Sequence, residues 1–263
     1  MRQAIRALLI GGGAVALILV IGYFSQMPWA IATWPWPDSR LSYIFVASIQ
    51  AAIGAAMLWI GASGEFGALA AGALNLVVMM GGASAFLLVY SMQPDQAHVL
   101  AYAIGCGVFA VANLLLFLWM HRVPQPNLQP IPRVVWLSFA AFTIILVLVG
   151  VALIRKVPNI MPWVLKPETS VMVGLIFFGD AFYFLYALLR PYWVYARAQL
   201  WSFLAYDLVL IVPLLAHFAV VKPELLPSLV VYTAVLIVSS AVASYYLFVN
   251  KTTRVWGAVM TIR

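Results

Sequence analysis

The chain has 263 residues, of which 66% are hydrophobic and only 8% are charged. A soluble domain carries about 25% charged residues, so this composition excludes a globule surrounded by water. The formal charge of +7 comes from basic residues placed singly at the ends of apolar runs. This pattern is typical of membrane topology signals and argues against a nucleic-acid partner.

The residues that usually carry catalysis or bind metals are few and scattered. Cys106 is the single cysteine and lies in an apolar run, so neither a disulfide framework nor a cysteine metal cluster is predicted. The three histidines are His98, His121 and His217, and they are far apart in the sequence. Because the sequence shows no Ser–His–acid set and no phosphate loop, an enzyme is the least favoured class, and we predict no catalytic or metal site.

The apolar runs predict an all-α integral membrane bundle with eight transmembrane helices. A bilayer core of about 30 Å needs about 20 apolar residues in helical form, since irregular backbone cannot face lipid. The expected spans, in chain order, are 4–24, 41–62, 68–91, 98–120, 134–154, 169–190, 200–221 and 229–249. We interpret the first span as an uncleaved signal anchor, and the whole chain, 1–263, as one transmembrane domain.

The distribution of Lys and Arg over alternate loops predicts the orientation. With the N-terminus inside a bacterial cell, nine basic residues are cytoplasmic and five lie on the opposite side, so both termini are expected in the cytoplasm and the protein in the inner membrane. The cytoplasmic set is Arg2, Arg6, Arg122, Arg133, Arg190, Arg197, Lys251, Arg254 and Arg263, and the opposite set is Arg40, Arg155, Lys156, Lys166 and Lys222.

Two long connectors resemble each other and indicate an internal repeat. One contains Trp34, Pro35, Trp36 and Pro37, and the other contains Pro162 and Trp163, at an offset of about 127 residues. Each half then reads as a span, a connector and three spans, which predicts a parallel 4+4 duplication of 1–133 and 134–263. We expect the connectors to lie on the outer interface as aromatic anchors, or alternatively to form a lip that recognises a ligand or partner.

These connectors resemble those of a group of uncharacterised bacterial polytopic membrane proteins. In that group a W-P-W connector with a nearby proline precedes a helix that begins with Leu, Thr or Ser. The residues that carry the resemblance are Trp34 to Pro37 with Leu41 and Ser42, and more loosely Trp163, Pro167, Thr169 and Ser170. Arg40 stands where the second proline is expected. The resemblance implies a membrane location and lends no activity.

Two carboxyl groups inside the predicted spans, Asp180 and Asp207, are the proton or ion candidates. A charged side chain in a span costs about 2.5–3.5 kcal/mol on insertion scales and faces the bundle interior or a wet cavity. If spans six and seven pack face to face, the two groups differ in depth by roughly 5 Å and become neighbours, which suits proton relay or cation binding. The alternative is a protonated Asp that hydrogen-bonds to a neighbouring helix.

A bound cofactor is a further hypothesis, although none is identified by the sequence. His217 follows Pro213 by four residues and is a candidate ligand to a haem iron or a chlorin magnesium, or else a hydrogen-bonded interior histidine. Spans six and seven also contain many aromatic residues, which either line a pocket for a quinone, carotenoid or chlorin or face the lipid.

Because the spans contain so few polar groups, the sequence favours a structural or accessory subunit that binds other membrane proteins or lipids. The first alternative is a proton- or cation-coupled small-molecule transporter or channel that uses Asp180 and Asp207. The second alternative is a protein that binds an apolar cofactor.

Overall fold

The computed structural model describes residues 2–123 and 128–258, and its regular structure is α-helical. Within these ranges eight helical segments are long and apolar enough to span a membrane, which confirms the predicted number. The long helices are α1 (Arg2–Phe24), α3 (Arg40–Ser63), α4 (Leu69–Tyr90), α5 (Leu100–Met120), α6 (Arg133–Ile154), α7 (Pro167–Leu189), α8 (Trp193–His217) and α9 (Leu226–Ser244).

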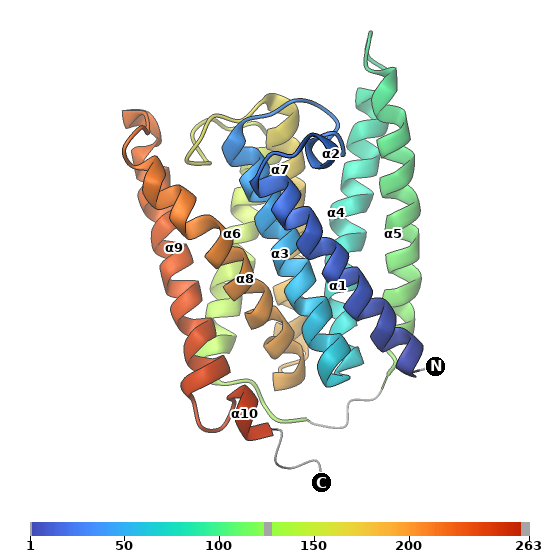
Figure 1. Cartoon of the computed structure of the whole chain (residues 1–263), viewed down its shortest axis with the longest axis vertical. Helices are drawn as coiled ribbons and strands as arrows, with labels where there is room; N and C mark the ends of the chain where they lie inside the picture. Colours follow the sequence, from blue (N-terminus) through green and yellow to red (C-terminus); the bar gives the residue numbers. More distant parts are fainter. Residues whose placement is uncertain (1, 124–127, 259–263) are drawn as a thin grey trace.

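Short helical turns complete these segments. Single 3₁₀ turns at Phe66–Ala68, Ala97–Val99 and Pro223–Leu225 lead into α4, α5 and α9, and a π-helical turn at Tyr245–Val249 extends α9. The short helix α2 (Pro28–Ile31) lies in the first long connector, and α10 (Val255–Ala258) follows α9. The start of α1 and the helix α10 lie at the same end of the bundle, which we call the terminal end, and α2 lies at the opposite, connector end (Figure 1).

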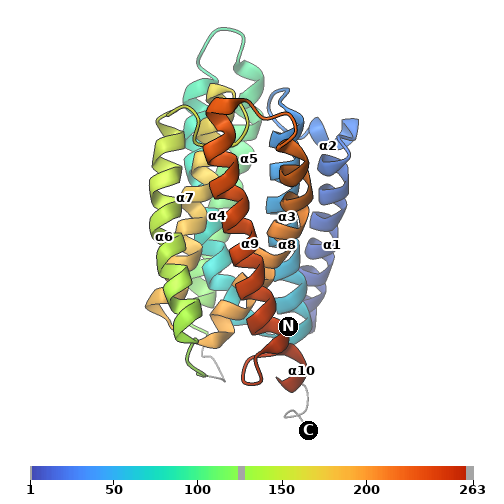
Figure 2. The same ribbon diagram turned by 90° about the vertical axis from the view of Figure 1, so that its left-hand side faces the viewer.

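The long helices form two rows of four. Along the first row the neighbours are α1, α3, α8 and α9, and along the second they are α5, α4, α7 and α6. Figure 2 shows α1, α3 and α8 on one side of the bundle and α4, α6 and α7 on the other. Each row therefore combines two helices from each half of the chain.

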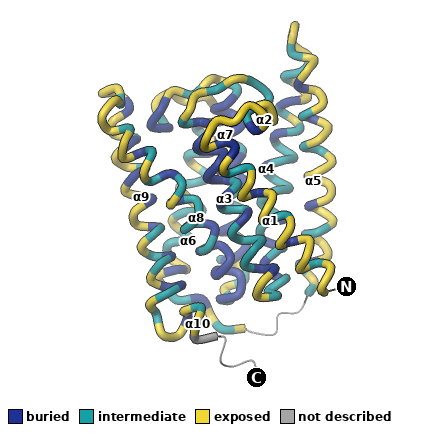
Figure 3. Tube along the Cα trace, in the orientation of Figure 1, coloured by how far each residue is buried: buried dark blue, intermediate teal, exposed yellow. Residues whose placement is uncertain are grey.

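Burial is concentrated on the central helices. Most of the residues in the apolar windows of α3 and α7 are buried, whereas only 17–22% of those in α1, α5 and α6 are. The yellow stretches of α1 and α5 in Figure 3 show the exposed faces of these outer helices. The exposed residues of α1, α5 and α6 are largely Leu, Ile and Val. These faces match the apolar surface that lipid requires, and the interior is formed where the two rows meet.

The ends of α3 show how local sequence sets the helix bounds. The Ser39 hydroxyl caps the N-terminus by accepting a hydrogen bond from the Ser42 backbone N–H. At the other end Gly64 adopts a φ of 78° and its N–H bonds to the Ile60 carbonyl. Glycine is favoured at this left-handed position, so the helix stops there and the chain turns directly into the next span.

The seventh span differs from the prediction of 200–221. The helix α8 begins at Trp193 and ends at His217, seven residues earlier than expected at its start. The polar side chains of Arg197 and Gln199 favour a loop over 193–199 when the sequence is considered alone. Both side chains are buried in the helix, where they have polar partners, so their polarity does not mark a loop.

Candidate functional site

Asp207 is a buried carboxyl group in the middle of α8, and its side chain is 1% exposed. Its Oδ2 atom accepts hydrogen bonds from the Ser239 and Ser240 hydroxyls of α9, at 2.7 and 3.0 Å. Its Oδ1 atom is buried and has no hydrogen-bond partner in the described structure. One oxygen is therefore fixed by α9, and the other is left able to hold a proton.

Asp180 lies in α7, and its contact comes from a different helix. The Asn75 side-chain amide of α4 donates a hydrogen bond of 2.7 Å to Asp180 Oδ1. The adjacent Gly179 makes this approach possible, because a Cβ atom there would lie 2.6 Å from Asn75 Oδ1 and 2.9 Å from the Met79 side chain. Asn75 thus bridges α4 and α7 beside the carboxyl group.

The face-to-face packing of the sixth and seventh spans, on which the predicted contact between Asp180 and Asp207 depended, does not occur. The helix α7 packs along its length on α6 and α4, and α8 packs on α3 and α9. The physical reason is that the two helices belong to different rows and meet mainly near the short turn between them. Each carboxyl group is consequently held by a neighbour from its own row.

A pair of hydrogen-bonded tyrosines lies near the two carboxyl groups. Tyr206 on α8 forms a hydroxyl–hydroxyl hydrogen bond with Tyr232 on α9. Both rings lie close enough to Asp180 and Asp207 to interact electrostatically with them. The carboxyl groups, the amide and the hydroxyls therefore form one polar cluster between the rows, which we call the interior cluster: Asn75, Asp180, Tyr206, Asp207, Tyr232, Ser239 and Ser240.

The interior cluster consists of groups that can exchange protons. The hydrogen bonds to Asp180 and Asp207 come from an amide and two hydroxyls, all uncharged. A carboxyl group with neutral partners in an apolar medium can change its protonation state without breaking an ion pair. Among the described residues, no three or more His, Cys, Asp or Glu side chains are grouped so that they could hold a metal ion.

The connector tryptophans are bonded across the molecule. Trp36 Nε1 donates to the Thr169 hydroxyl at the start of α7 at 2.8 Å, and Trp163 Nε1 donates to the Ser42 hydroxyl at the start of α3 at 3.1 Å. Trp163 is only 5% exposed, so it differs from an anchor in the headgroup layer. We call these two contacts the tryptophan bonds. Each one ties a connector of one half to a helix of the other half.

Other connector residues have separate contacts. The Trp34 Nε1 atom is buried without a hydrogen-bond partner in the described structure, beside the ring of Trp36. The Pro37 carbonyl accepts a hydrogen bond from the Lys166 ammonium group of the second connector. Pro35 lies between the two tryptophans and Pro162 precedes Trp163. The two connectors are therefore in direct contact with each other as well as with the helices.

His217 contacts the second connector. Its Nε2 atom lies 3.1 Å from the Pro162 carbonyl, in hydrogen-bond geometry. With Nε2 as the donor, the ring holds the connector against the end of α8. The helix α8 continues through Pro213 to this residue.

The aromatic residues of α7 and α8 mostly fill the interior, so the expectation that they face lipid is wrong for this group. Phe184 is 4% exposed and its ring stacks on that of Phe203, with centroids 4.6 Å apart. Phe139 and Phe142 of α6 complete the same cluster. Aromatic rings bury large areas, and this contact ties α6, α7 and α8 together near the terminal end.

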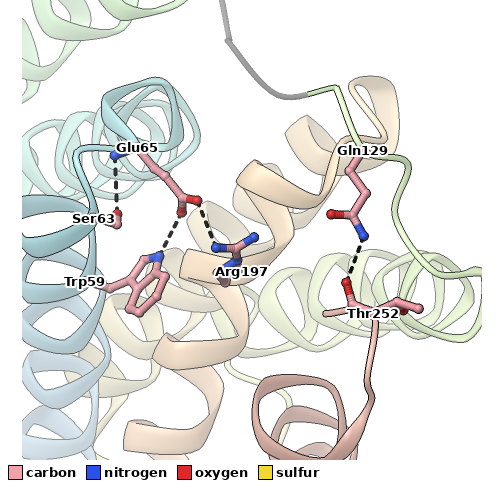
Figure 4. A network of polar contacts seen from close by, with 6 residues as sticks. All are labelled: Trp59, Ser63, Glu65, Gln129, Arg197 and Thr252. Atoms are coloured by element: carbon pink, nitrogen blue, oxygen red, sulfur yellow. Dashed lines mark hydrogen bonds and ion pairs between the residues drawn. The ribbon is translucent and has the colours of Figure 1, made fainter. Parts of the chain in front are cut away.

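The structure also contains an ion pair, between the buried Arg197 and the partly buried Glu65, that sequence reasoning missed. Arg197 Nη1 lies 3.1 Å from Glu65 Oε1, and Trp59 donates a hydrogen bond of 2.8 Å to Glu65 Oε2 (Figure 4). The guanidinium lies over the Trp59 and Trp193 rings, 5.7 Å from each centroid. Burial raises the pKa of Glu65, while Arg197 and the Trp59 bond oppose that rise.

A sequence signal for this ion pair exists. Trp193, Arg197 and Trp201 are spaced by four residues, which places them on one face of a helix. The interpretation of Arg197 as a topology signal in a cytoplasmic loop is therefore wrong. Near the ion pair the Gln129 amide donates to the Thr252 carbonyl at 3.1 Å, which ties the segment before α6 to the segment after α9 (Figure 4).

Comparison with known proteins does not assign a family. No protein-family model, curated protein or solved structure matches the chain. The geometry of the interior cluster is therefore the main guide to function.

Proposed function

We propose that this polytopic membrane protein is a proton-coupled transporter in which Asp180 and Asp207 bind and release the coupling protons. The observation that supports this proposal is the interior cluster, where two carboxyl groups have uncharged hydrogen-bond partners and lie near the Tyr206–Tyr232 hydroxyl pair. Ionisable groups are costly inside a membrane and mark proton relays and ion pathways. A purely structural subunit has no need of two such groups.

The cluster suggests how a proton moves. The Oδ1 atom of Asp207 is the free acceptor, since the two serines occupy Oδ2. We propose that the tyrosine pair passes a proton between the carboxyl of the second row and that of the first when it comes within hydrogen-bond distance of them, because hydroxyl groups both donate and accept hydrogen bonds. Asn75 holds Asp180 by its amide, which leaves the charge of that carboxyl uncompensated when it ionises.

Proton flux into liposomes tests this function. Purified protein is reconstituted with pyranine inside, a potassium diffusion potential is imposed, and the internal pH is followed with and without a small-molecule extract of the native cells. We expect flux with the wild-type protein, and the level of empty liposomes with Asp180→Asn or Asp207→Asn. Asparagine keeps the shape of the side chain, but its amide cannot take up and release a proton as a carboxyl group does.

The matched control is Asp95→Asn, which removes a carboxyl from an exposed turn at the connector end. Flux equal to that of the wild-type protein is expected for this variant. If the wild-type protein shows no flux under either condition, or if both interior variants retain full flux, the proposed function is wrong.

We further propose that the terminal end faces the cytoplasm. The support is the excess of Lys and Arg in the segments at that end, although Arg197 now belongs to a helix and not to a loop. A reporter enzyme fused after Arg263 and active only outside the cytoplasm would contradict this orientation.

We also propose that the two halves arose by parallel duplication. An exchange of the halves turns the neighbours of one row into those of the other, since α1·α3, α3·α8 and α8·α9 become α6·α7, α7·α4 and α4·α5. The tryptophan bonds exchange in the same way, because an offset of about 127 residues relates Trp36 to Trp163 and Ser42 to Thr169. This reciprocity is what supports a repeat.

An accessory role is the second candidate, and α5 is the feature that favours it. This helix packs along its length on α4 alone and exposes a continuous apolar surface, which suits a partner helix as well as lipid. The exposed residues are Ile104, Val108, Val111, Leu115 and Leu118. Stoichiometric co-purification of a second membrane protein in mild detergent would support this role, and a single species would contradict it.

A further inference from the structure

Three side-chain bonds at the connector end run between the two rows. Trp36 precedes α3 in the first row and donates to Thr169 of α7 in the second. Trp163 precedes α7 in the second row and donates to Ser42 of α3 in the first. The Lys166 bond to the Pro37 carbonyl crosses in the same way. The connector end is therefore closed by contacts that depend on the relative position of the rows.

The contacts that hold the carboxyl groups run within the rows. Asn75 and Asp180 belong to α4 and α7 of the second row. Asp207 and its partner Ser239 belong to α8 and α9 of the first row. A movement of one row against the other would leave these hydrogen bonds intact, while it would break both tryptophan bonds. The two kinds of contact are thus separated by the architecture.

The terminal end is also closed between the rows, by different residues. The Gln199 amide of α8 donates to the Tyr183 carbonyl of α7 at 2.6 Å, and both residues are buried. The Tyr195 and Tyr186 rings meet edge to face, with centroids 5.4 Å apart. The interior cluster therefore lies between two closed ends, as alternating access requires of its occluded state.

From this separation we infer that the two four-helix rows are the moving bodies of the transporter and that the tryptophan bonds are its gate at the connector end. This inference rests on the proposed function, because it describes access to the carboxyl groups of the interior cluster. Opening breaks both tryptophan bonds together, since both cross between the rows. One has its donor in the connector of the first row, and the other has its donor in the connector of the second row. Asp180 and Asp207 then become accessible to water from the connector end, each still held by its own row.

Access of a thiol reagent to a buried cysteine tests the gate. Val173 lies one turn below Thr169 on α7, is 1% exposed and belongs to the same buried cluster as Trp163. A Cys106→Ala, Val173→Cys protein in lipid nanodiscs is treated with a charged methanethiosulfonate, and the labelling rate of the introduced thiol is measured. We expect slow labelling, because the closed gate excludes the reagent.

The gate is then weakened by removing both acceptor hydroxyls, with Ser42→Ala and Thr169→Val. These replacements remove both tryptophan bonds and also the Ser39–Ser42 and Thr169–Asp38 hydrogen bonds, so the labelling rate of the introduced thiol is expected to rise by about tenfold or more. The matched control, Ser138→Ala with Thr143→Val, removes one serine and one threonine hydroxyl that bond only to carbonyls of their own helix. Its labelling rate should equal that of the parent.

Unchanged labelling in the gate variant, with an unchanged helical circular dichroism spectrum, would overturn the gate. An increase of the same size in the control would also overturn it, because the effect would then be general loosening. If the gate variant loses its helical spectrum, Ser42→Ala alone is the deciding variant, with an expected rise of about fivefold from one bond. The labelling requires no proton gradient, so a protein without proton flux can still pass this test.

Discussion

The two halves of the chain, 1–133 and 134–263, agree at the connector end and differ at the level of the interior cluster. Trp36 and Trp163 have the same role, and Ser42 and Thr169 accept their hydrogen bonds in the same way. The positions that correspond to Asp180 and Asp207 are instead Ile53 and Met80. The architecture is thus shared by both halves, while the ionisable groups belong to the second half only. The candidate carboxyl groups therefore lie where the two halves differ in sequence.

The same comparison applies to the ion pair. Arg197 corresponds to Ala70, which is fully buried, and Glu65 corresponds to Tyr192. The Glu65–Arg197 pair therefore has no counterpart on the other side of the molecule. Replacing a residue by the one at the corresponding position of the other half, or removing one member of a corresponding pair, measures where the halves are equivalent.

The largest expected effect comes from Arg197→Ala, which gives the second half the residue of the first. Removing one partner of a buried pair leaves the other charge uncompensated, so we expect the free energy of unfolding to fall by about 3–5 kcal/mol. Thermal unfolding in mild detergent, followed by tryptophan fluorescence, would show a lower Tm. A Tm equal to that of the wild-type protein would show that the pair is not needed.

The loss of stability caused by Arg197→Ala should depend on pH. Burial raises the pKa of Glu65 above that of the unfolded chain, and removal of Arg197 removes the opposing effect. A group whose pKa is raised by folding contributes stability at low pH and loses it as the pH rises through the folded pKa. The deficit of Arg197→Ala should therefore be larger at pH 8 than at pH 5. As a control, Glu65→Gln with Arg197→Met should recover part of the loss, because no charge remains buried.

A smaller effect is expected from Gly174→Ala, which again copies the first half, where Ala47 occupies the corresponding position. A Cβ atom at Gly174 would lie 2.7 Å from the Gly150 carbonyl oxygen and 2.8 Å from the Ile154 backbone nitrogen. Because backbone atoms cannot turn aside, α6 and α7 must separate, at a cost of about 1–3 kcal/mol. The measurement is again the Tm in detergent.

Gly72→Ala is the matched control for this variant. Gly72 also lies within a long helix, but a Cβ atom there would meet nothing within 4 Å. Alanine is the better helix former by about 1 kcal/mol in a soluble host, so no loss of stability is expected. If both glycine variants lose stability equally, close approach of α6 and α7 is not the cause.

Most helix bounds could be predicted from the sequence, with the start of α8 as an exception, whereas the helix neighbours could not. The bilayer imposes a length and an internally satisfied backbone on every span, and this fixed α3 and α6 to within one residue. Which helices touch depends on side-chain fit, since any apolar face suits lipid as well as protein. For this reason the sequence pointed to a contact between α7 and α8, although the structure pairs α7 with α4.

The candidate site was predictable to a similar degree. Asp180 and Asp207 were recognisable because a carboxyl group interrupts an apolar run. Their partners Asn75 and Ser239 were not, because amides and hydroxyls occur in most spans. Arg197 was assigned to a loop because the sequence pattern of a basic residue near a span end is the same whether its side chain faces water or pairs with a distant carboxylate. Here the partner is Glu65, in the turn between α3 and α4.

The tryptophan bonds are expected to contribute less than the ion pair. Trp163→Phe and Trp36→Phe each remove one indole N–H, worth about 0.5–1.5 kcal/mol. Trp163 is the more buried of the two and also packs on Phe45 and Tyr232, so its replacement should lower the Tm further. Equal changes would mean that the halves are equivalent in energy as well as in geometry. Trp29→Phe, at an exposed tryptophan, is the control and should leave the Tm unchanged.

The smallest expected effect separates a rigid movement of the rows from independent movement of the connectors. Trp36 packs with Tyr90 and lies outside the buried cluster that contains Val173 and Trp163. In the Cys106→Ala, Val173→Cys protein, Trp36→Phe should still raise the labelling rate, by about threefold to fivefold for one hydrogen bond. The reason is that rigid rows share one closed state, so weakening either tryptophan bond shifts the same equilibrium. Separate connectors would confine the effect to the Trp163 side, and labelling of the introduced thiol would then not respond to Trp36→Phe at all.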